Sequence, residues 1–277
     1  MAAPAKQMSM PITALRNLVR ISDPHVARMM QDAPGPLLGL ADGDQPVALG
    51  AEAENVLVAT GPGGGTTTVL RTLAAQALGR GAVVDILDPT GAAHAWTKKL
   101  PGAAVHVRIQ EIHDYLLDAA QTLTPTARGT GTWEGRRVVV LESADQIAYA
   151  LRQFWAHTRP DSQLEDSPAI EALARLMVAG PAHNLQVLAD SPRGTVPALT
   201  DLPAGEVFPL RISAYSSASV WSRLAPGVWP APRYSVTPGR MHAVSGRQVT
   251  ALQALFLTPA EARALARGLA PAKEHRP

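Results

Sequence analysis

Residues 55–68 read Asn-Val-Leu-Val-Ala-Thr-Gly-Pro-Gly-Gly-Gly-Thr-Thr-Thr, and this stretch decides the fold. Val56–Ala59 is a short apolar run, typical of a strand that a parallel sheet buries on both faces. A cluster of glycines follows, and Thr67–Leu78 then has the apolar period of a helix. Strand, glycine loop and helix in this order form a setting in which backbone N–H groups and a helix N-terminus bind phosphate.

The loop matches the phosphate-binding pattern G-x-x-x-x-G-K-[ST] only in part. Setting Gly65 at the last glycine puts Thr67 at the magnesium-binding hydroxyl. Thr60 then takes the position of the first glycine, and Thr66 that of the lysine, which contacts the β- and γ-phosphates in working sites. Three interpretations stay open: a derelict nucleotide site, a working site whose cation comes from elsewhere, and a glycine-rich turn without chemistry.

The rest of the chain alternates apolar runs with helical periodicity, which favours an α/β fold with a mainly parallel sheet flanked by helices. Besides 56–59, the expected strands are 82–87, 104–107, 137–141, 185–189 and 207–212. The expected helices are 67–78, 110–123, 145–157, 167–178, 216–224 and 258–267. An Asp-Gly turn predicts a small lead-in β-hairpin over 37–49, and 241–256 is expected to be a second hairpin.

A break at Ala33-Pro34-Gly35-Pro36 divides the chain. Residues 1–33 are expected to be an N-terminal helical arm, amphipathic from Pro11 to Gln31, that docks on the core. Residues 34–270 are expected to be one α/β core, and residues 271–277 a disordered tail.

Composition excludes several classes of site. The 277 residues include no cysteine, which excludes disulfides, thiolate catalysis and iron–sulfur clusters. Aromatic residues make up only 4%, which argues against a stacking platform for single-stranded nucleic acid. The histidines lack metal-ligand spacing. No run reaches the about 18 apolar residues of a membrane span, and we expect a cytoplasmic protein without a membrane segment of its own.

Charge alone indicates no partner, since the net charge is only +2. Lysine is scarce: four of the 25 lysines and arginines are lysines, at positions 6, 98, 99 and 273. None of the four lies near the glycine loop in sequence.

Several motifs together resemble the motor domain of the FtsK/SpoIIIE family of DNA translocases, in particular its short actinobacterial members. Asn55–Thr60 and Val84–Asp88 are similar to the family's strands before and after the phosphate loop. Arg136–Glu142 resembles its Walker B strand, and Val187–Ala189 its sensor strand. The resemblance covers about residues 36–268 in order. It implies a RecA-like P-loop NTPase core, ATP and magnesium as ligands, and a ring of like or different subunits around double-stranded DNA.

Family positions transfer to this sequence with several losses. Glu142 keeps the first Walker B acid, which holds magnesium through water, but Ser143 stands where the catalytic acid belongs. The sensor glutamine falls at Ser191 or Pro192. Arg211 keeps one of two family arginines and is a candidate finger, whereas Tyr215 replaces the other. The positions implied to bind nucleotide are Thr60, Gly61, Gly63, Gly64, Gly65, Thr66, Thr67, Thr68 and Asp88, with Thr67 and Glu142 for magnesium.

Loss of the lysine, the catalytic acid and the sensor together removes charge neutralisation, water activation and γ-phosphate sensing. We therefore expect a degenerate Walker site, a pseudo-ATPase, and an accessory role in DNA transfer or partitioning with other DNA-transfer proteins. Two alternatives are an active ATP-dependent DNA translocase and a scaffold that has lost both nucleotide and DNA.

Overall fold

The computed structural model describes residues 15–52, 54–123, 125–126, 129–130, 135–159, 166–196, 204–233 and 235–268. The expected tail at 271–277 and residues 1–14 of the expected N-terminal arm lie outside these residues. Within them, no helix is both long and apolar enough to cross a membrane.

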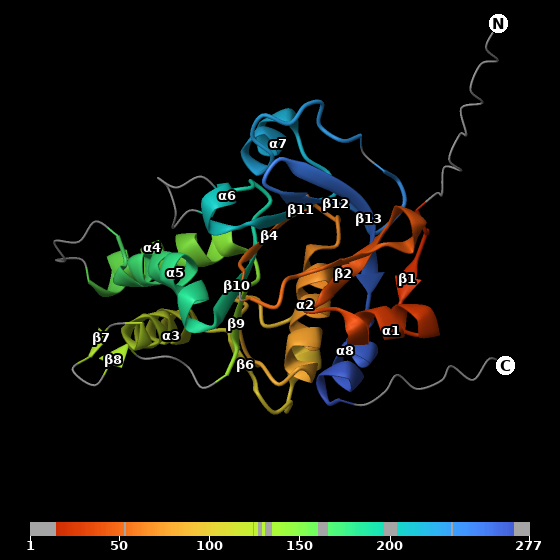
Figure 1. The fold of residues 1–277 in the computed structure, drawn as a ribbon. Coiled ribbons are helices and arrows are strands. Elements are labelled where there is room, and N and C mark those ends of the chain that lie inside the picture. The colour runs from red at the N-terminus through yellow and green to blue at the C-terminus, as the bar shows by residue number, and fades with distance from the viewer. Residues whose placement is uncertain are drawn as a thin grey trace, which may run out of the picture.

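One eleven-stranded sheet organises the molecule (Figure 1). Six neighbouring strands are mutually parallel and form its centre, in the order β11-β4-β10-β9-β5-β6. Their bounds are Leu210–Ser213, Val56–Ala59, Leu185–Asp190, Arg137–Leu141, Val83–Leu87 and Ala103–His106. The mainly parallel α/β fold expected from the alternating apolar runs is confirmed.

Antiparallel strands extend this sheet beyond β11. The expected terminal hairpin forms β12 and β13, and the lead-in hairpin, β2 and β3, adds to β13. Their bounds are Arg240–Ser245, Gln248–Phe256, Leu37–Ala41 and Pro46–Ala48. The two hairpins, from opposite ends of the chain, therefore pair in one sheet.

Helices cover both faces of the sheet (Figure 1). Helices α1, α2 and α8 lie on one face, with bounds Pro24–Asp32, Thr66–Gly79 and Pro259–Ala266. Helices α3, α4 and α5 lie on the other, with bounds Ile109–Thr122, Ala144–Thr158 and Pro168–Ala179. Along β9, Val138 and Val140 face α2 whereas Val139 and Leu141 face α4 and α5, so the central strands are buried on both faces.

Shorter elements complete the fold. Helices α6 and α7 occupy Ala204–Val207 and Ala218–Leu224, and 3-10 turns occupy Asp42–Asp44, Ala95–Thr97 and Gly180–His183. Between α3 and β9, β7 (Pro125–Thr126) and β8 (Gly129–Thr130) form a separate small pair. The expected strand at 207–212 begins later, at Leu210, because Val207 ends α6.

The N-terminal arm differs from the helix expected over Pro11–Gln31. Val19–Arg20 forms β1, parallel to β13, and the helix begins only at Pro24. The Asp23 side chain caps α1, and proline disfavours helical backbone in the residue before it, so the helix starts there. Val19 and Val26 lie in the same core as α2, which packs the described part of the arm against the body.

Candidate functional site

The glycine loop joins β4 to α2 in a shape that requires glycine. Gly61, Gly63 and Gly65 have φ angles of 74°, 70° and 90°, in the left-handed region that side chains disfavour. Gly64 is needed for space, because a Cβ there would meet the Thr60 carbonyl oxygen at 2.2 Å. The Gly64 N–H donates to the Gly61 carbonyl at 3.0 Å and closes the turn.

The N-terminus of α2 points into this loop. Gly65 is its N-cap and contributes no side-chain cap, and the first helical turn closes where the Val69 N–H donates to the Gly65 carbonyl at 3.0 Å. The N–H groups of Thr66, Thr67 and Thr68 precede that bond, as at the start of every α-helix. Loop and helix terminus together fit a phosphate group.

Thr66, at the lysine position, is tied back to the strand. Its hydroxyl lies 2.5 Å from the Thr60 hydroxyl, so the two positions that bracket the loop are hydrogen-bonded to each other. Arg71, one turn into the helix, donates to the Leu257 carbonyl at 3.0 and 3.2 Å and to Thr68 Oγ1 at 3.4 Å. The Arg71 guanidinium is therefore held at the end of β13.

Three polar residues mark the carboxyl ends of neighbouring strands. Thr60 follows β4, Asp190 ends β10 and Glu142 follows β9. The alternation along these strands turns all three toward α2. Carboxyl ends of parallel strands are where open α/β sheets bind ligands.

Glu142 is the centre of this row, and the structure brings it to Thr67. The Thr67 hydroxyl donates to Glu142 Oε1, and Glu142 Oε2 lies 2.8 Å from His94 Nε2. Because the hydroxyl proton is directed at the carboxylate, the Thr67 oxygen keeps lone pairs for a cation. A hydroxyl and a carboxylate are oxygen ligands of the kind magnesium takes beside nucleotide phosphates, so these residues fit that ion.

Sequence reasoning missed His94 and Asp190. Burial and the nearby Glu142 carboxylate raise the pKa of Asp190 to about 7, although the Ser143 backbone N–H donates to it and opposes the shift. The order of the strands could have identified Asp190, because Asp190 and Glu142 stand at the carboxyl ends of two neighbouring parallel strands. No spacing in the sequence could have found His94.

Two other residues expected at the site, Asp88 and Ser143, lie in the segments that follow β5 and β9. Asp88 is fully buried and accepts hydrogen bonds from Thr90 N–H, Thr90 Oγ1 and Ala93 N–H at 2.6–3.0 Å, so it organises the turn after β5. Ser143 has a left-handed backbone, with φ of 63°, at the start of α4. Among the described residues, no three His, Asp or Glu side chains gather in a cluster that could hold a metal ion.

Arg211, the candidate finger, is buried within this chain. Its side chain is 2% exposed, and its guanidinium donates to four carbonyl oxygens, those of Leu224, Phe208, Pro209 and Gly246, at 2.7–3.4 Å. These bonds tie the residues before β11 to the end of α7 and to the turn between β12 and β13.

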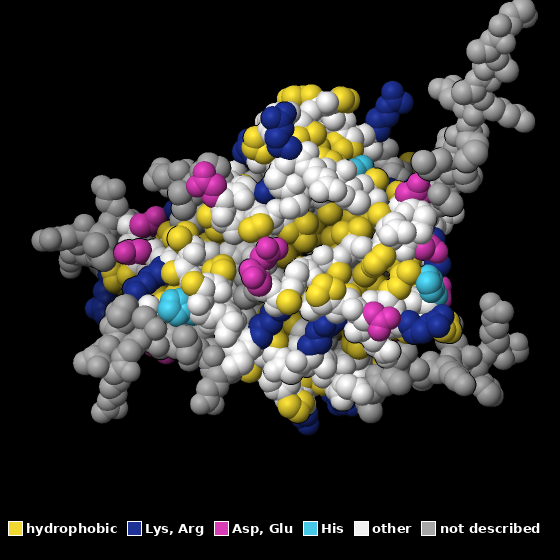
Figure 2. Space-filling model, in the orientation of Figure 1, with side chains coloured by type: hydrophobic (Ala, Val, Ile, Leu, Met, Phe, Trp, Pro, Cys, Tyr) yellow, Lys and Arg dark blue, Asp and Glu magenta, His cyan; other side chains and the backbone are white. Residues whose placement is uncertain are grey.

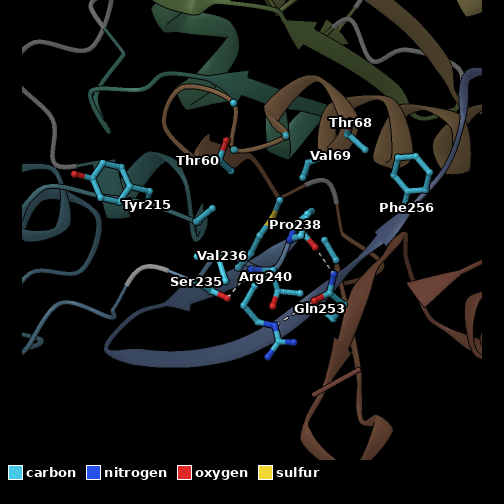
Figure 3. A pocket seen from close by; sticks show the side chains of 18 of the residues that line it. Thr60, Thr68, Val69, Tyr215, Ser235, Val236, Pro238, Arg240, Gln253 and Phe256 are labelled. Atoms are coloured by element: carbon cyan, nitrogen blue, oxygen red, sulfur yellow. Dashed lines mark hydrogen bonds between the residues drawn. The ribbon is translucent and has the colours of Figure 1, made fainter. Parts of the chain in front are cut away.

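A cavity of about 840 Å³ adjoins the loop (Figure 3). Thr60 and Thr68 lie on its loop side, and strands β12 and β13 form the opposite wall. Tyr215 and Phe256 stand at two sides of it, and Val236 adds apolar surface. A mostly apolar space beside a phosphate cradle suits a ligand with a flat apolar part and an anionic part.

The chain matches no protein-family profile and no curated protein sequence. Its fold is similar to that of the pCW3 conjugation coupling protein TcpA, in a monomer form with ATPγS, with a TM-score of 0.64 and 13% identity. That likeness covers 92% of this chain and 75% of TcpA.

Two secretion proteins are similar to a comparable degree. The cytoplasmic domain of the Thermomonospora curvata type VII secretion ATPase EccC has a TM-score of 0.61 at 13% identity, over 88% of this chain and 28% of that one. EssC ATPases 2 and 3 from Geobacillus thermodenitrificans have a TM-score of 0.59 at 15% identity, over 96% and 52%. This chain thus spans about a quarter of the length of the EccC domain and about half of the length of the EssC chain. The likeness shows the fold, that of RecA-like P-loop ATPases.

Proposed function

We propose that this chain is an FtsK/SpoIIIE-like protein that binds a nucleotide at the glycine loop and hydrolyses ATP little or not at all. We further propose that it serves DNA transfer or partitioning as an accessory or ring subunit. The observation that carries nucleotide binding is the Thr67–Glu142 contact at the mouth of the loop. The two residues would hold magnesium beside the loop, whose N–H groups can bind phosphate. The adjoining cavity can hold the base.

Weak hydrolysis follows from three replacements. Thr66 brings no positive charge to the β- and γ-phosphates, and Ser143 brings no carboxylate to the attacking water. The sensor glutamine is replaced by Ser191 or Pro192, and Ser191 is buried and donates to the Thr195 carbonyl. Losing one preorganised electrostatic group costs about 3–4 kcal/mol of transition-state stabilisation, so three losses leave little turnover.

The role in DNA transfer is supported by the motif resemblance and by the shared fold with a conjugation coupling protein. We base the accessory role, beside active homologues in a ring around double-stranded DNA, on arginines that form ion pairs within the chain. Such paired charges offer less attraction for DNA phosphates. Arg16 pairs with Asp23 and Asp44, and Arg137 pairs with Asp85. On the face shown in Figure 2, Lys and Arg side chains are scattered and form no continuous stripe.

Calorimetric titration with ATPγS and magnesium tests nucleotide binding, with phosphate release measured alongside. We expect binding with little release, and release restored in the double variant Thr66→Lys/Ser143→Glu. Absence of binding in both proteins would favour the scaffold alternative. Capture of double-stranded DNA by the protein mixed with an active translocase, but not by either alone at low concentration, is the outcome expected of a ring subunit.

One observation favours a second candidate, slow ATP hydrolysis by this chain itself. Asp190 places a second carboxyl beside Glu142, on the α2 side of the sheet, although Ser143 lacks one. DNA-stimulated phosphate release that disappears in both Glu142→Ala and Asp190→Asn would support this candidate. Release at the background level in the unmodified protein would exclude it.

A further inference from the structure

His94 connects Glu142 to a tryptophan. It lies in the turn between β5 and the 3-10 turn at Ala95–Thr97, and its side chain is fully buried. One ring nitrogen, Nε2, lies 2.8 Å from Glu142 Oε2, and the other, Nδ1, lies 3.2 Å from Trp96 Nε1. The imidazole therefore bridges an acceptor and a donor.

These two contacts determine the tautomer of His94. An indole N–H only donates, so Nδ1 must accept from Trp96 and carries no proton. The proton of the neutral ring is then on Nε2, which donates to Glu142. Together with the Thr67 hydroxyl, His94 gives each carboxylate oxygen of Glu142 a donor. The carboxylate plane is thereby fixed from two sides.

Several hydrogen bonds fix the turn that contains His94. The buried Asp88 carboxylate binds the turn at Thr90 and Ala93. Thr97 Oγ1 donates to the His94 carbonyl at 2.8 Å, and Arg263 of α8 donates to the Trp96 carbonyl at 2.8 Å. The position of the imidazole is thus set by contacts with Asp88, which follows β5, and with Arg263 of α8.

We propose that His94 is a positioning residue for Glu142, and that the pair makes the site selective for a nucleotide in its magnesium complex. This rests on the proposed nucleotide function. His94 keeps Glu142 against Thr67, so the oxygen ligands of the metal are in place before the ligand arrives. The lysine charge is missing at Thr66, so attraction for the β- and γ-phosphates comes mainly through the metal. A partner of a metal-binding carboxylate acts in this way in known metal sites.

Nucleotide affinity measured with magnesium and with EDTA tests the selectivity. The unmodified protein is expected to bind ATPγS much more tightly with magnesium. His94→Ala should weaken binding about 10- to 100-fold in magnesium and leave binding in EDTA unchanged. His94→Gln, whose amide N–H can donate to Glu142, should recover part of the loss. Equal losses in magnesium and EDTA, or no loss in either, would overturn the proposal.

A matched control separates positioning from packing. His113 of α3 is also buried, and its ring stacks on Trp155 with centroids 5.9 Å apart, on the other face of the sheet. His113→Gln should change thermal stability without changing the ratio of affinities in magnesium and EDTA. A change in that ratio as large as in His94→Ala would mean that packing alone explains the effect.

The tautomer is testable without any ligand. The ¹⁵N imidazole spectrum of the nucleotide-free protein should show His94 as the neutral ring protonated at Nε2. Trp96→Phe should shift the Nδ1 resonance, because it removes the donor to that nitrogen. A ring protonated at Nδ1 would refute the assignment. If the unmodified protein binds no nucleotide, the proposed function fails, whereas this spectrum still decides whether His94 donates to Glu142.

Discussion

The hydroxyl groups of Thr66 and Thr60 lie 2.5 Å apart, so the residue at the lysine position of the loop is hydrogen-bonded to the residue at its first glycine position. In a working phosphate loop these positions hold a cation and a residue without a side chain. Here a short polar bridge closes the loop and brings no charge. The loop thus keeps the shape of a phosphate cradle while losing its main attraction for phosphate.

Thr66→Lys should tighten binding of ATPγS about 10- to 100-fold, because hydrogen bonds to charged groups contribute about 1.5–3 kcal/mol. The matched control is Thr66→Val, which also breaks the bridge to Thr60 but adds no charge. It should cost about 1 kcal/mol of stability and leave affinity unimproved. Calorimetric titration compares the three proteins. If the lysine variant binds no more tightly than the valine variant, phosphate does not occupy this loop.

Gly64→Ala should weaken nucleotide binding more than Gly63→Ala. A Cβ at Gly64 would meet the Thr60 carbonyl oxygen at 2.2 Å and force the loop open, whereas a Cβ at Gly63 meets nothing within 4 Å. Gly63→Ala therefore carries only the left-handed backbone cost of about 1–2 kcal/mol. Gly43→Ala, in the lead-in hairpin with φ of 65° and open space, controls for that cost. Urea unfolding and nucleotide titration of the three variants check the order.

The sequence was sufficient to predict the central fold because burial on both faces leaves a direct trace in the residues. Val138–Leu141 is apolar without interruption, since both sides of β9 are covered by helices. The terminal and lead-in hairpins were likewise predicted from alternation and turn residues. Their pairing with each other was not, because a contact between β2 and β13 leaves no local pattern.

The site was predictable only where motifs are contiguous. The loop and Thr67 follow one strand, and Glu142 follows another, so parallel topology brings them together. His94 reaches Glu142 through a turn whose path depends on Asp88 and on α8, and no periodicity encodes such a path. The Arg211 assignment came from resemblance alone, and no pattern in the sequence indicated that its side chain is buried.

Arg211→Met should destabilise the protein by about 3 kcal/mol, because it leaves buried carbonyl oxygens without a donor. Nucleotide affinity of the folded fraction should not change. The control is Arg247→Met, whose exposed side chain donates to the Gly227 carbonyl and whose loss should cost far less. Denaturant unfolding measures both. A finger role would instead appear as normal stability with lost phosphate release in rings mixed with an active homologue.

Asp190→Asn should stabilise the protein at pH 8 and have little effect at pH 3, below the ordinary pKa of an aspartate. The folded state raises the pKa of Asp190 from an ordinary 3.8 to about 7, so the unfolded chain loses this proton first as pH rises. Stability is then lost between about pH 4 and 7, and the variant should regain about 1–2 kcal/mol at pH 8, less than the full shift because the group is partly exposed. Asp44→Asn provides the opposite sign: Arg16 lowers the pKa of Asp44, so this variant should be destabilised at neutral pH and converge with the unmodified protein in acid. Urea unfolding from pH 3 to pH 8 decides both signs, and a stabilisation by Asp190→Asn that is equal at pH 3 and pH 8 would contradict the raised pKa.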